Sequence, residues 1–132
     1  LERYIKDMLI EMHTLAEMAD TVVLPAAYAY LGALADAAAK ARAAGIKVVP
    51  QLAAANEAGA MVAELQKQAG ALRAAIAKAE HMHDSAEKQA KFLTADGANA
   101  MGAVREASDT LELRIGDAFW PLPRYREMLF PV

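Results

Sequence analysis

Cysteine is absent from the 132 residues of this chain. Without thiols, neither a disulfide framework nor a cysteine-ligated metal site can form, and a reducing compartment is compatible with the sequence. Aromatic residues are also scarce, at 6% of the chain, and Trp120 is the single tryptophan. Alanine is abundant but buries little area per residue, so Leu, Ile, Val, Met and the few aromatic side chains must carry most of the core energy.

Positive charge is not in excess either. The chain has 14 Lys and Arg residues against 17 Asp and Glu residues, a net charge of −3. This balance provides no electrostatic footprint for nucleic acid or an anionic membrane, so we expect neither as a partner. The longest uncharged run, Thr21 to Ala35, is broken by Pro25 and is shorter than the roughly 18 residues of a membrane-spanning helix. The N-terminal residues show no signal-peptide pattern.

Apolar residues at spacings of three and four dominate what is present. They form stripes that predict amphipathic helices over residues 2–44, 51–81 and 85–118. Pro25 lacks an amide donor and must interrupt the first helix near Val22–Leu24. Because the connectors are short, consecutive helices should be antiparallel neighbours. We therefore predict an all-α antiparallel bundle of three long helices over residues 1–118, which becomes four-helix-like if Pro25 splits the first helix.

Several residues inside these segments bear on packing. Gly59 and Gly70 each weaken the second helix by about 1 kcal/mol relative to alanine, so we expect them to permit close helix contact. Met8 and Met12 fall on the apolar stripe, which favours core positions over an adaptable binding surface. Asp96-Gly97 is a turn signal, but the stripe continues in phase across it, which predicts a weakened helix there.

One cluster has the residue types of a metal site: His81, His83 and Asp84. Two histidines two positions apart do not share a helix face, and no third ligand lies at a recognisable spacing. We therefore favour a polar turn in which Asp84 or Ser85 caps the next helix, and keep the three residues as weak metal-ligand candidates. His13 stands among polar neighbours, which predicts a surface or boundary position.

Motifs for common catalytic chemistry are missing. The sequence contains no Gly-rich phosphate loop and no nucleotide-binding fingerprint. It also lacks Ser, His and Asp in an order typical of a catalytic triad. Paired carboxylates at Glu11 and Glu17, and at Glu106, Asp109 and Glu112, stand among basic residues and are typical of solvated helix faces. We therefore predict no catalytic or cofactor-binding residue in this chain.

The end of the chain departs from the helical pattern. Pro121 and Pro123 prevent the third helix from continuing, and large apolar side chains crowd around them. We predict that residues 119–132 form an extended tail that packs on the bundle or on a neighbouring subunit. Arg124 and Arg126 could recognise an acidic partner or face solvent. The predicted anchor residues of the tail are Trp120, Leu122, Tyr125, Leu129 and Phe130.

Both ends of the chain resemble type III glutamine synthetases. The ending FWPLPRYREMLF, residues 119–130, is similar to the C-terminal ending of that family. The stretches LERYIKDMLIEM, residues 1–12, and TVVLPAA, residues 21–27, resemble the start of the family's helical C-terminal region. The alanine-rich middle adds little, and residues 92–101 depart from the more apolar, proline-containing version expected of the family.

The resemblance implies a large, ring-shaped cytoplasmic oligomer that makes glutamine from glutamate and ammonia with ATP and a divalent metal such as Mg. It also implies that the ligands of ATP, glutamate and metal lie upstream, and no family catalytic residue matches a position here. Because the chain opens at Leu1 inside an amphipathic pattern, we expect a piece of a longer enzyme. The implied role is a non-catalytic structural or assembly domain whose partners are the upstream catalytic domain and the other subunits of a homo-oligomer.

Two further classes of function stay open. A free-standing helical-bundle interaction or sensor module would bind a partner helix in a groove, and would need a start codon near Leu1. A metal enzyme that uses His81, His83 and Asp84 would be stabilised by its metal.

Overall fold

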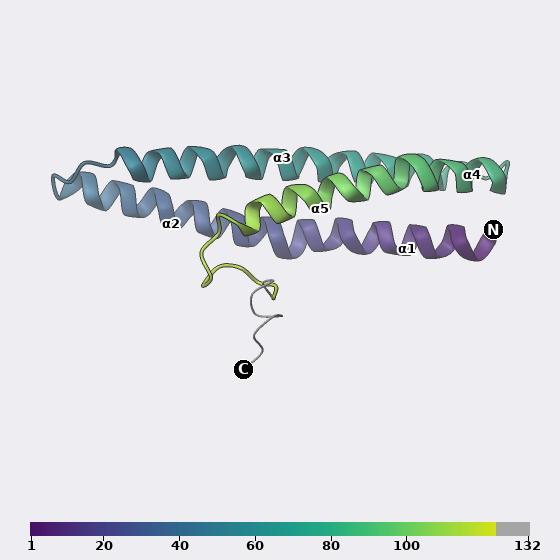
Figure 1. Ribbon diagram of the computed structural model, residues 1–132, viewed down its shortest axis with the longest axis horizontal. Coiled ribbons are helices and arrows are strands. Elements are labelled where there is room, and N and C mark those ends of the chain that lie inside the picture. The colour runs from purple at the N-terminus through teal and green to yellow at the C-terminus, as the bar shows by residue number, and fades with distance from the viewer. Residues whose placement is uncertain (124–132) are drawn as a thin grey trace.

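The computed structural model describes residues 1–123 as helices joined by short turns, and this part of the chain contains no strand. The all-α prediction is therefore confirmed for these residues. The helices form three rods that lie side by side, and the chain reverses direction from each rod to the next (Figure 1). Residues 124–132 lie outside the described part, and with them the predicted tail anchors Tyr125, Leu129 and Phe130.

The first rod is a continuous run of helix from Glu2 to Ala43. It comprises α1 (Glu2–Met18), the π-helical turn η1 (Ala19–Val23) and α2 (Leu24–Ala43). The N–H of Leu24 donates to the carbonyl of Ala19, five residues back, immediately before Pro25. Because proline has no amide hydrogen, the ordinary bond to the residue four positions back is lost at this point. The predicted interruption is confirmed, as a π-helical turn inside an unbroken rod.

The second rod is α3 (Val49–Glu80), which has 32 residues. The turn that leads into it closes at Gly45, whose φ of +78° is costly for any side chain. The N–H of Ile46 donates to the carbonyl of Ala41 and that of Gly45 to Arg42, so two carbonyls at the end of α2 are satisfied. Gly45 therefore stops the first rod, one residue beyond the predicted helix of residues 2–44.

The third rod comprises α4 (Ala86–Phe92), the π-helical turn η2 (Leu93–Gly97) and α5 (Ala98–Glu112). Ser85 is its N-cap, because the Ser85 hydroxyl accepts a 3.3 Å hydrogen bond from the N–H of Lys88. The N–H of Ala98 reaches the carbonyl of Leu93 across the Asp96-Gly97 pair. The predicted weakened helix is confirmed at this pair, again as a π-helical turn.

The third rod ends earlier than its sequence predicts. The expected helix runs to Ala118, but α5 stops at Glu112. The N–H groups of Arg114 and Ile115 both converge on the carbonyl of Leu111, at 2.9 Å each. Because one carbonyl accepts hydrogen bonds from two amides, the last turn is tighter and the regular α-helical hydrogen-bond pattern does not continue. The chain beyond this point is a turn that leads into the tail.

A single apolar core runs between the rods. Its largest fully buried side chains are Met12, Leu65, Leu72, Leu93, Leu111 and Val104. Small side chains fill the spaces between them, and the core alanines at 2% exposure or less are Ala19, Ala27, Ala69 and Ala79. Alanine adds little buried area but lets the rods approach closely, so the leucines and Met12 supply most of the apolar burial.

The glycine that permits close helix contact is not one of the two expected. A Cβ placed on Gly59 would meet nothing within 4 Å, and one on Gly70 would meet only Arg73 of the same helix. A Cβ on Gly97 would instead lie 3.3 Å from the sulfur of Met12 on α1. The prediction for Gly59 and Gly70 is therefore wrong, because glycine spacing along a helix does not reveal which face meets a neighbour.

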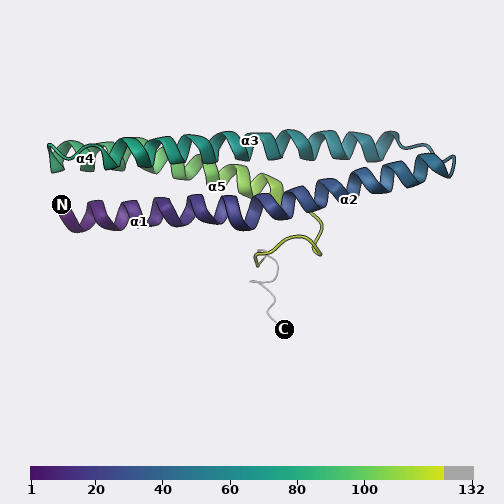
Figure 2. The same cartoon turned by 180° about the vertical axis from the view of Figure 1, so that it is seen from behind.

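The three rods overlap along only part of their length (Figure 2). α3 packs against α2 at one end and against α5, α1 and η2 towards the other. Past the end of α5, the pair formed by α2 and α3 continues without a third rod (Figure 1). Apolar side chains are exposed at the tip of this pair, where Ile46 is 59%, Val49 73% and Leu52 39% exposed.

Length and composition alone would allow the first rod to cross a membrane. An apolar window within Glu2–Ala43 has a mean hydropathy of 1.5, and 22% of that window is buried. Core helices of water-soluble proteins meet the same criterion, so the expectation of no membrane partner stays a prediction. Several side chains of α2 face outward, including Tyr28 at 47% exposure.

Candidate functional site

The three weak metal-ligand candidates lie in the exposed turn between α3 and α4. His81 follows the last residue of α3, and its Nδ1 donates a 2.7 Å hydrogen bond to the carbonyl of Ala77. The rings of His81 and His83 are 6.5 Å apart at their centroids. Within residues 1–123, no group of three or more His, Cys, Asp or Glu side chains could hold a metal ion. His81, His83 and Asp84 therefore form a polar turn in this part of the chain.

Half-exposed ion pairs tie the rods to one another. Each joins side chains about half accessible to solvent, and they are His13–Glu80 at 3.1 Å, Asp20–Arg73 at 2.7 Å, Glu11–Arg105 at 3.0 Å and Glu57–Arg114 at 2.7 Å. Solvent screening limits each to at most about 1 kcal/mol. Glu11 thus lies on a solvated face, as its sequence context predicts, and sequence analysis missed its partner on another rod. The pairs position the rods rather than form a reactive site.

The described part of the tail packs on the chain's own rods. The ring of Phe119 meets that of Tyr30 on α2 edge to face, with centroids 5.7 Å apart. Trp120 and Leu122 are half-buried and pack against the core. Leu122 lies in a groove between the first rod and α5, beside Leu15 and Val104. The structure therefore places two predicted anchors, Trp120 and Leu122, against the chain's own rods.

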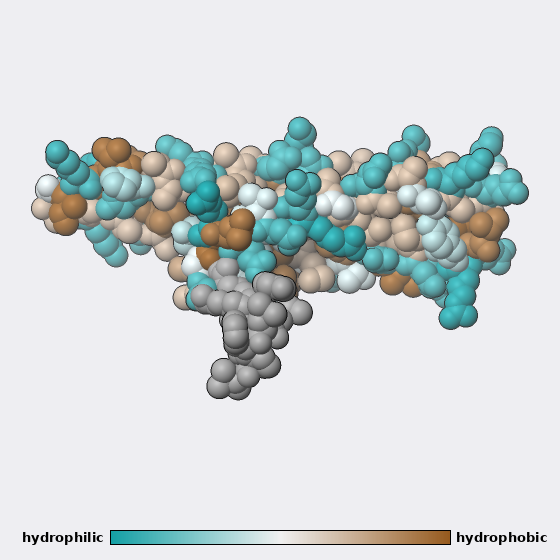
Figure 3. Space-filling view, viewed as in Figure 1, coloured by the Kyte–Doolittle hydropathy of each residue, from teal (hydrophilic) through white to brown (hydrophobic). Residues whose placement is uncertain are grey.

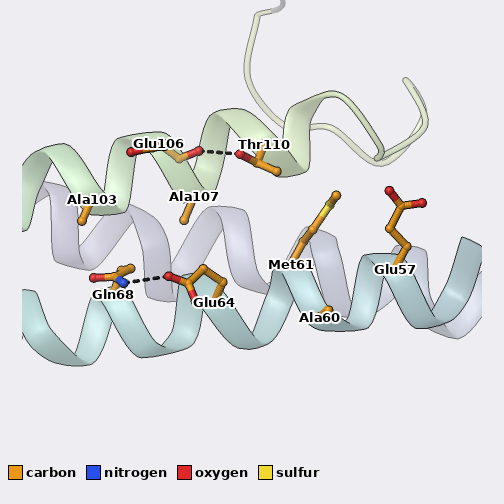
Figure 4. A pocket seen from close by; sticks show the side chains of 9 residues that line it. All are labelled: Glu57, Ala60, Met61, Glu64, Gln68, Ala103, Glu106, Ala107 and Thr110. Carbon is orange, nitrogen blue, oxygen red and sulfur yellow. Dashed lines mark hydrogen bonds between the residues drawn. The ribbon is translucent and has the colours of Figure 1, made fainter.

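A second groove, which we call the acidic groove, lies between α3 and α5 and has a volume of about 380 Å³ (Figure 4). Small and apolar side chains line its floor: Ala60, Met61, Ala103 and Ala107. Polar side chains line its walls: Glu57, Glu64 and Gln68 from α3, and Glu106 and Thr110 from α5. In Figure 4 the side chains of Ala103 and Ala107 point down from α5 towards α3.

The carboxylates of the acidic groove are only partly neutralised. Glu57 pairs with Arg114 at 2.7 Å. Glu64 accepts a 2.7 Å hydrogen bond from the neutral amide of Gln68, and the Thr110 hydroxyl donates to the backbone carbonyl of Glu106 rather than to its carboxylate. Within residues 1–123, Glu64 and Glu106 make no ion pair. Two uncompensated negative charges therefore flank an apolar floor.

A groove of this kind can bind a segment that carries both cations and apolar side chains. Carboxylates and hydroxyl oxygens accept charge-assisted hydrogen bonds from Arg or Lys, and alanine and methionine provide apolar contact. Sequence analysis missed this site. The only available signal was the spacing of Glu57 and Glu64, seven residues apart and hence on one face of α3, and nothing in it identifies α5 as the opposite wall.

A match to a known family covers the first rod. The family model described as the glutamine synthetase C-terminal domain matches residues 1–42. Comparisons with curated proteins and with solved structures gave no match. The matched residues correspond to α1, η1 and α2, and leave α3 and α5 outside. Over its first rod, the chain is thus similar to the glutamine synthetase C-terminal domain.

Proposed function

We propose that this chain is a non-catalytic structural domain of a type III-like glutamine synthetase, in which the three rods act as one antiparallel bundle. The observation that carries the proposal is the match of residues 1–42 to the glutamine synthetase C-terminal domain. The resemblance of residues 1–12 and 119–130 to type III enzymes supports the finer assignment.

The distribution of charged and apolar groups supports a structural role. The cross-rod ion pairs join one rod to another, as Asp20 does to Arg73 and Glu11 to Arg105. Large apolar side chains remain exposed at the tip, among them Ile46 and Val49. Exposed apolar surface of this kind is typical of faces that contact another protein surface.

In this proposal the sites for ATP, glutamate and Mg belong to a catalytic domain upstream, and the whole cytoplasmic protein ligates ammonia to glutamate. The bundle covers that domain or a neighbouring subunit of a homo-oligomer. The N-terminal part of α2, residues 24–35, carries no charged side chain and includes Tyr28 at 47% exposure, so its burial in such a contact would leave no charge without water.

The tail fastens either the bundle or the assembly. Trp120 and Leu122 already lie against the core of their own chain. Each large apolar side chain contributes about 1.5–3 kcal/mol when fully buried, so a tail with several of them is an effective anchor.

The test is to delete residues 119–132 from the full-length protein and to measure oligomer mass by light scattering together with synthetase activity. We expect a smaller assembly and reduced activity. The matched control is Leu113→Ala, which removes an apolar side chain that is 83% exposed and should change neither quantity. Deletion of the tail with assembly and activity both intact would rule out the fastening role.

The alternative is a free-standing helical interaction or sensor module. The acidic groove favours it, since a groove with an apolar floor and charged walls suits a partner segment. The open reading frame upstream of Leu1 discriminates between the two proposals, because a glutamine synthetase catalytic domain there excludes a free-standing module.

A further inference from the structure

We infer that the acidic groove receives residues 124–132 from a second copy of this chain, with Arg124 and Arg126 paired to Glu64 and Glu106. The inference rests on the proposed fastening role of the tail and deepens it by naming the receptor.

The side chains that line the acidic groove include no Arg or Lys, whereas the tail carries two arginines. Glu64 and Glu106 stand on opposite walls, on α3 and on α5 (Figure 4). By contrast, the groove between α1 and α3 contains a cation of its own, since Arg73 pairs with Asp20. His13 hydrogen-bonds to Glu80 there, so within residues 1–123 Glu17 is the one lining carboxylate that neither group contacts. The acidic groove is therefore the one of these two that attracts a cationic segment.

The tail segment has the matching composition. Residues 124–132 read RYREMLFPV, with two arginines, one glutamate and mostly apolar side chains otherwise. Arginine forms forked, charge-assisted hydrogen bonds with carboxylates, so it suits Glu64 and Glu106. The apolar side chains of the segment suit the floor around Met61 and Ala107.

The position of Leu122 favours a second copy as the donor. Leu122 lies in the groove between the first rod and α5, whereas the acidic groove lies between α5 and α3. α5, which is about 10 Å across with its side chains, therefore separates the start of the tail from the acidic groove of its own chain. Nine extended residues span at most about 30 Å, and a path around α5 would use part of that length. More of the segment can therefore lie along the groove of a neighbouring copy. Figure 3 shows hydrophilic side chains spread among apolar ones along the face of the molecule seen in Figure 1.

The experiment measures self-association of the full 132-residue chain by sedimentation equilibrium. We expect concentration-dependent association that Glu64→Lys with Glu106→Lys weakens by about tenfold or more, a size typical of two lost charge pairs. The matched control, Glu17→Lys with Asp36→Lys, makes the same change in net charge at exposed residues outside the acidic groove and should leave association unchanged. Melting curves of all variants should overlap, because the four residues are exposed. A wild-type chain that stays monomeric would overturn the inference.

A charge swap tests the pairing and its direction. One variant carries Glu64→Lys and Glu106→Lys, and the other carries Arg124→Glu and Arg126→Glu. Each alone should associate weakly, whereas an equimolar mixture should associate as the wild type does, since each tail then meets a groove of opposite charge. No recovery in the mixture would overturn docking between copies, and recovery only when all four changes share one chain would place the tail in its own groove.

The outcome is separable from that of the proposed function. If deletion of residues 119–132 disrupts the full-length assembly but the groove substitutions Glu64→Lys and Glu106→Lys do not, the fastening role holds and the acidic groove is not the receptor. If the deletion itself has no effect, both proposals fall.

Discussion

At the scale of single residues, the contact between Met12 and Gly97 controls how closely the first and third rods approach. Met12 is fully buried, and Gly97 lies beneath its thioether on η2. A side chain at position 97 would press on the Met12 sulfur at 3.3 Å and would touch Leu93 at 3.5 Å. This position favours glycine because of its neighbour, since the φ of Gly97 is an ordinary −62°.

We expect Gly97→Val to destabilise the chain by about 1–3 kcal/mol, because added methyl groups overpack a close-packed interface. Chemical denaturation monitored by circular dichroism measures the change. Gly102→Val is the matched control: a Cβ there meets nothing within 4 Å, so its effect should stay within about 0.5 kcal/mol.

The same contact predicts coupling between the two residues. Met12→Ala alone should cost about 2–5 kcal/mol through the cavity that it leaves. In the double variant Met12→Ala with Gly97→Val, the valine occupies part of that cavity, so the total loss should be smaller than the sum of the single losses. Strict additivity would show that the two side chains do not compete for the same space.

At the scale of elements, the ends and irregular turns of the helices follow from local hydrogen bonding. Pro25 removes an amide and η1 forms just before it, whereas η2 forms at Asp96-Gly97 without any proline. The N-terminus of α4 is held by the Ser85 hydroxyl. Asp84, the other predicted cap, lies one residue too early to serve the N–H of Lys88.

Ser85→Ala should therefore destabilise the chain by about 1 kcal/mol, the usual cost of a lost N-cap. Asp84→Ala serves as the control and should have a smaller effect. The measurement is the free energy of unfolding of each variant under the same conditions. An equal loss for both substitutions would contradict the assignment of Ser85 as the cap.

The tail is the second element whose anchoring can be measured. Trp120→Ala should cost about 2 kcal/mol in the full chain, less than a fully buried tryptophan, because Trp120 is only half-buried against the core. Leu113→Ala, at a residue that is 83% exposed, should change stability by less than about 0.5 kcal/mol. A melting temperature insensitive to Trp120→Ala would mean that this side chain contacts a partner instead of the rods of its own chain.

At the scale of the whole molecule, stability is unevenly distributed along the rods. The continuous core includes Ala27 and Val62 but not Ala38, Val48 or Ala58, which are buried outside it towards the tip. Two rods bury less apolar surface per residue than three, so the tip formed by α2 and α3 should open first.

Native-state hydrogen exchange measures this gradient. We expect amides around Ala38 and Ala58 to exchange at least about tenfold faster than those around Leu72 and Val104, through local opening of the two-rod tip. Uniform protection along α3 would indicate that something covers the tip in solution, and self-association should then be examined at the same protein concentration.

The sequence predicted more of the fold than of the site. Helical periodicity and Pro25 were enough to locate the rods and an interruption in the first of them, and the structure gave that interruption its π-helical form. The early end of α5 was not predicted, because the apolar stripe continues to Ile115 while the hydrogen-bond ladder does not. The acidic groove was not predicted, because Glu64 and Glu106 are 42 positions apart.

What the sequence by itself determined is local. The spacing of apolar residues and the positions of proline and glycine determine where helices and turns form. They act locally, through hydrogen bonds between residues a few positions apart. Only the tertiary structure decided that Gly97, and neither Gly59 nor Gly70, meets a neighbouring rod. It also decided that Glu11 pairs with Arg105, while Glu64 and Glu106 line one groove. Such juxtapositions depend on how whole rods are rotated and offset against each other, and that is set by the summed packing of many side chains rather than by any short stretch of sequence.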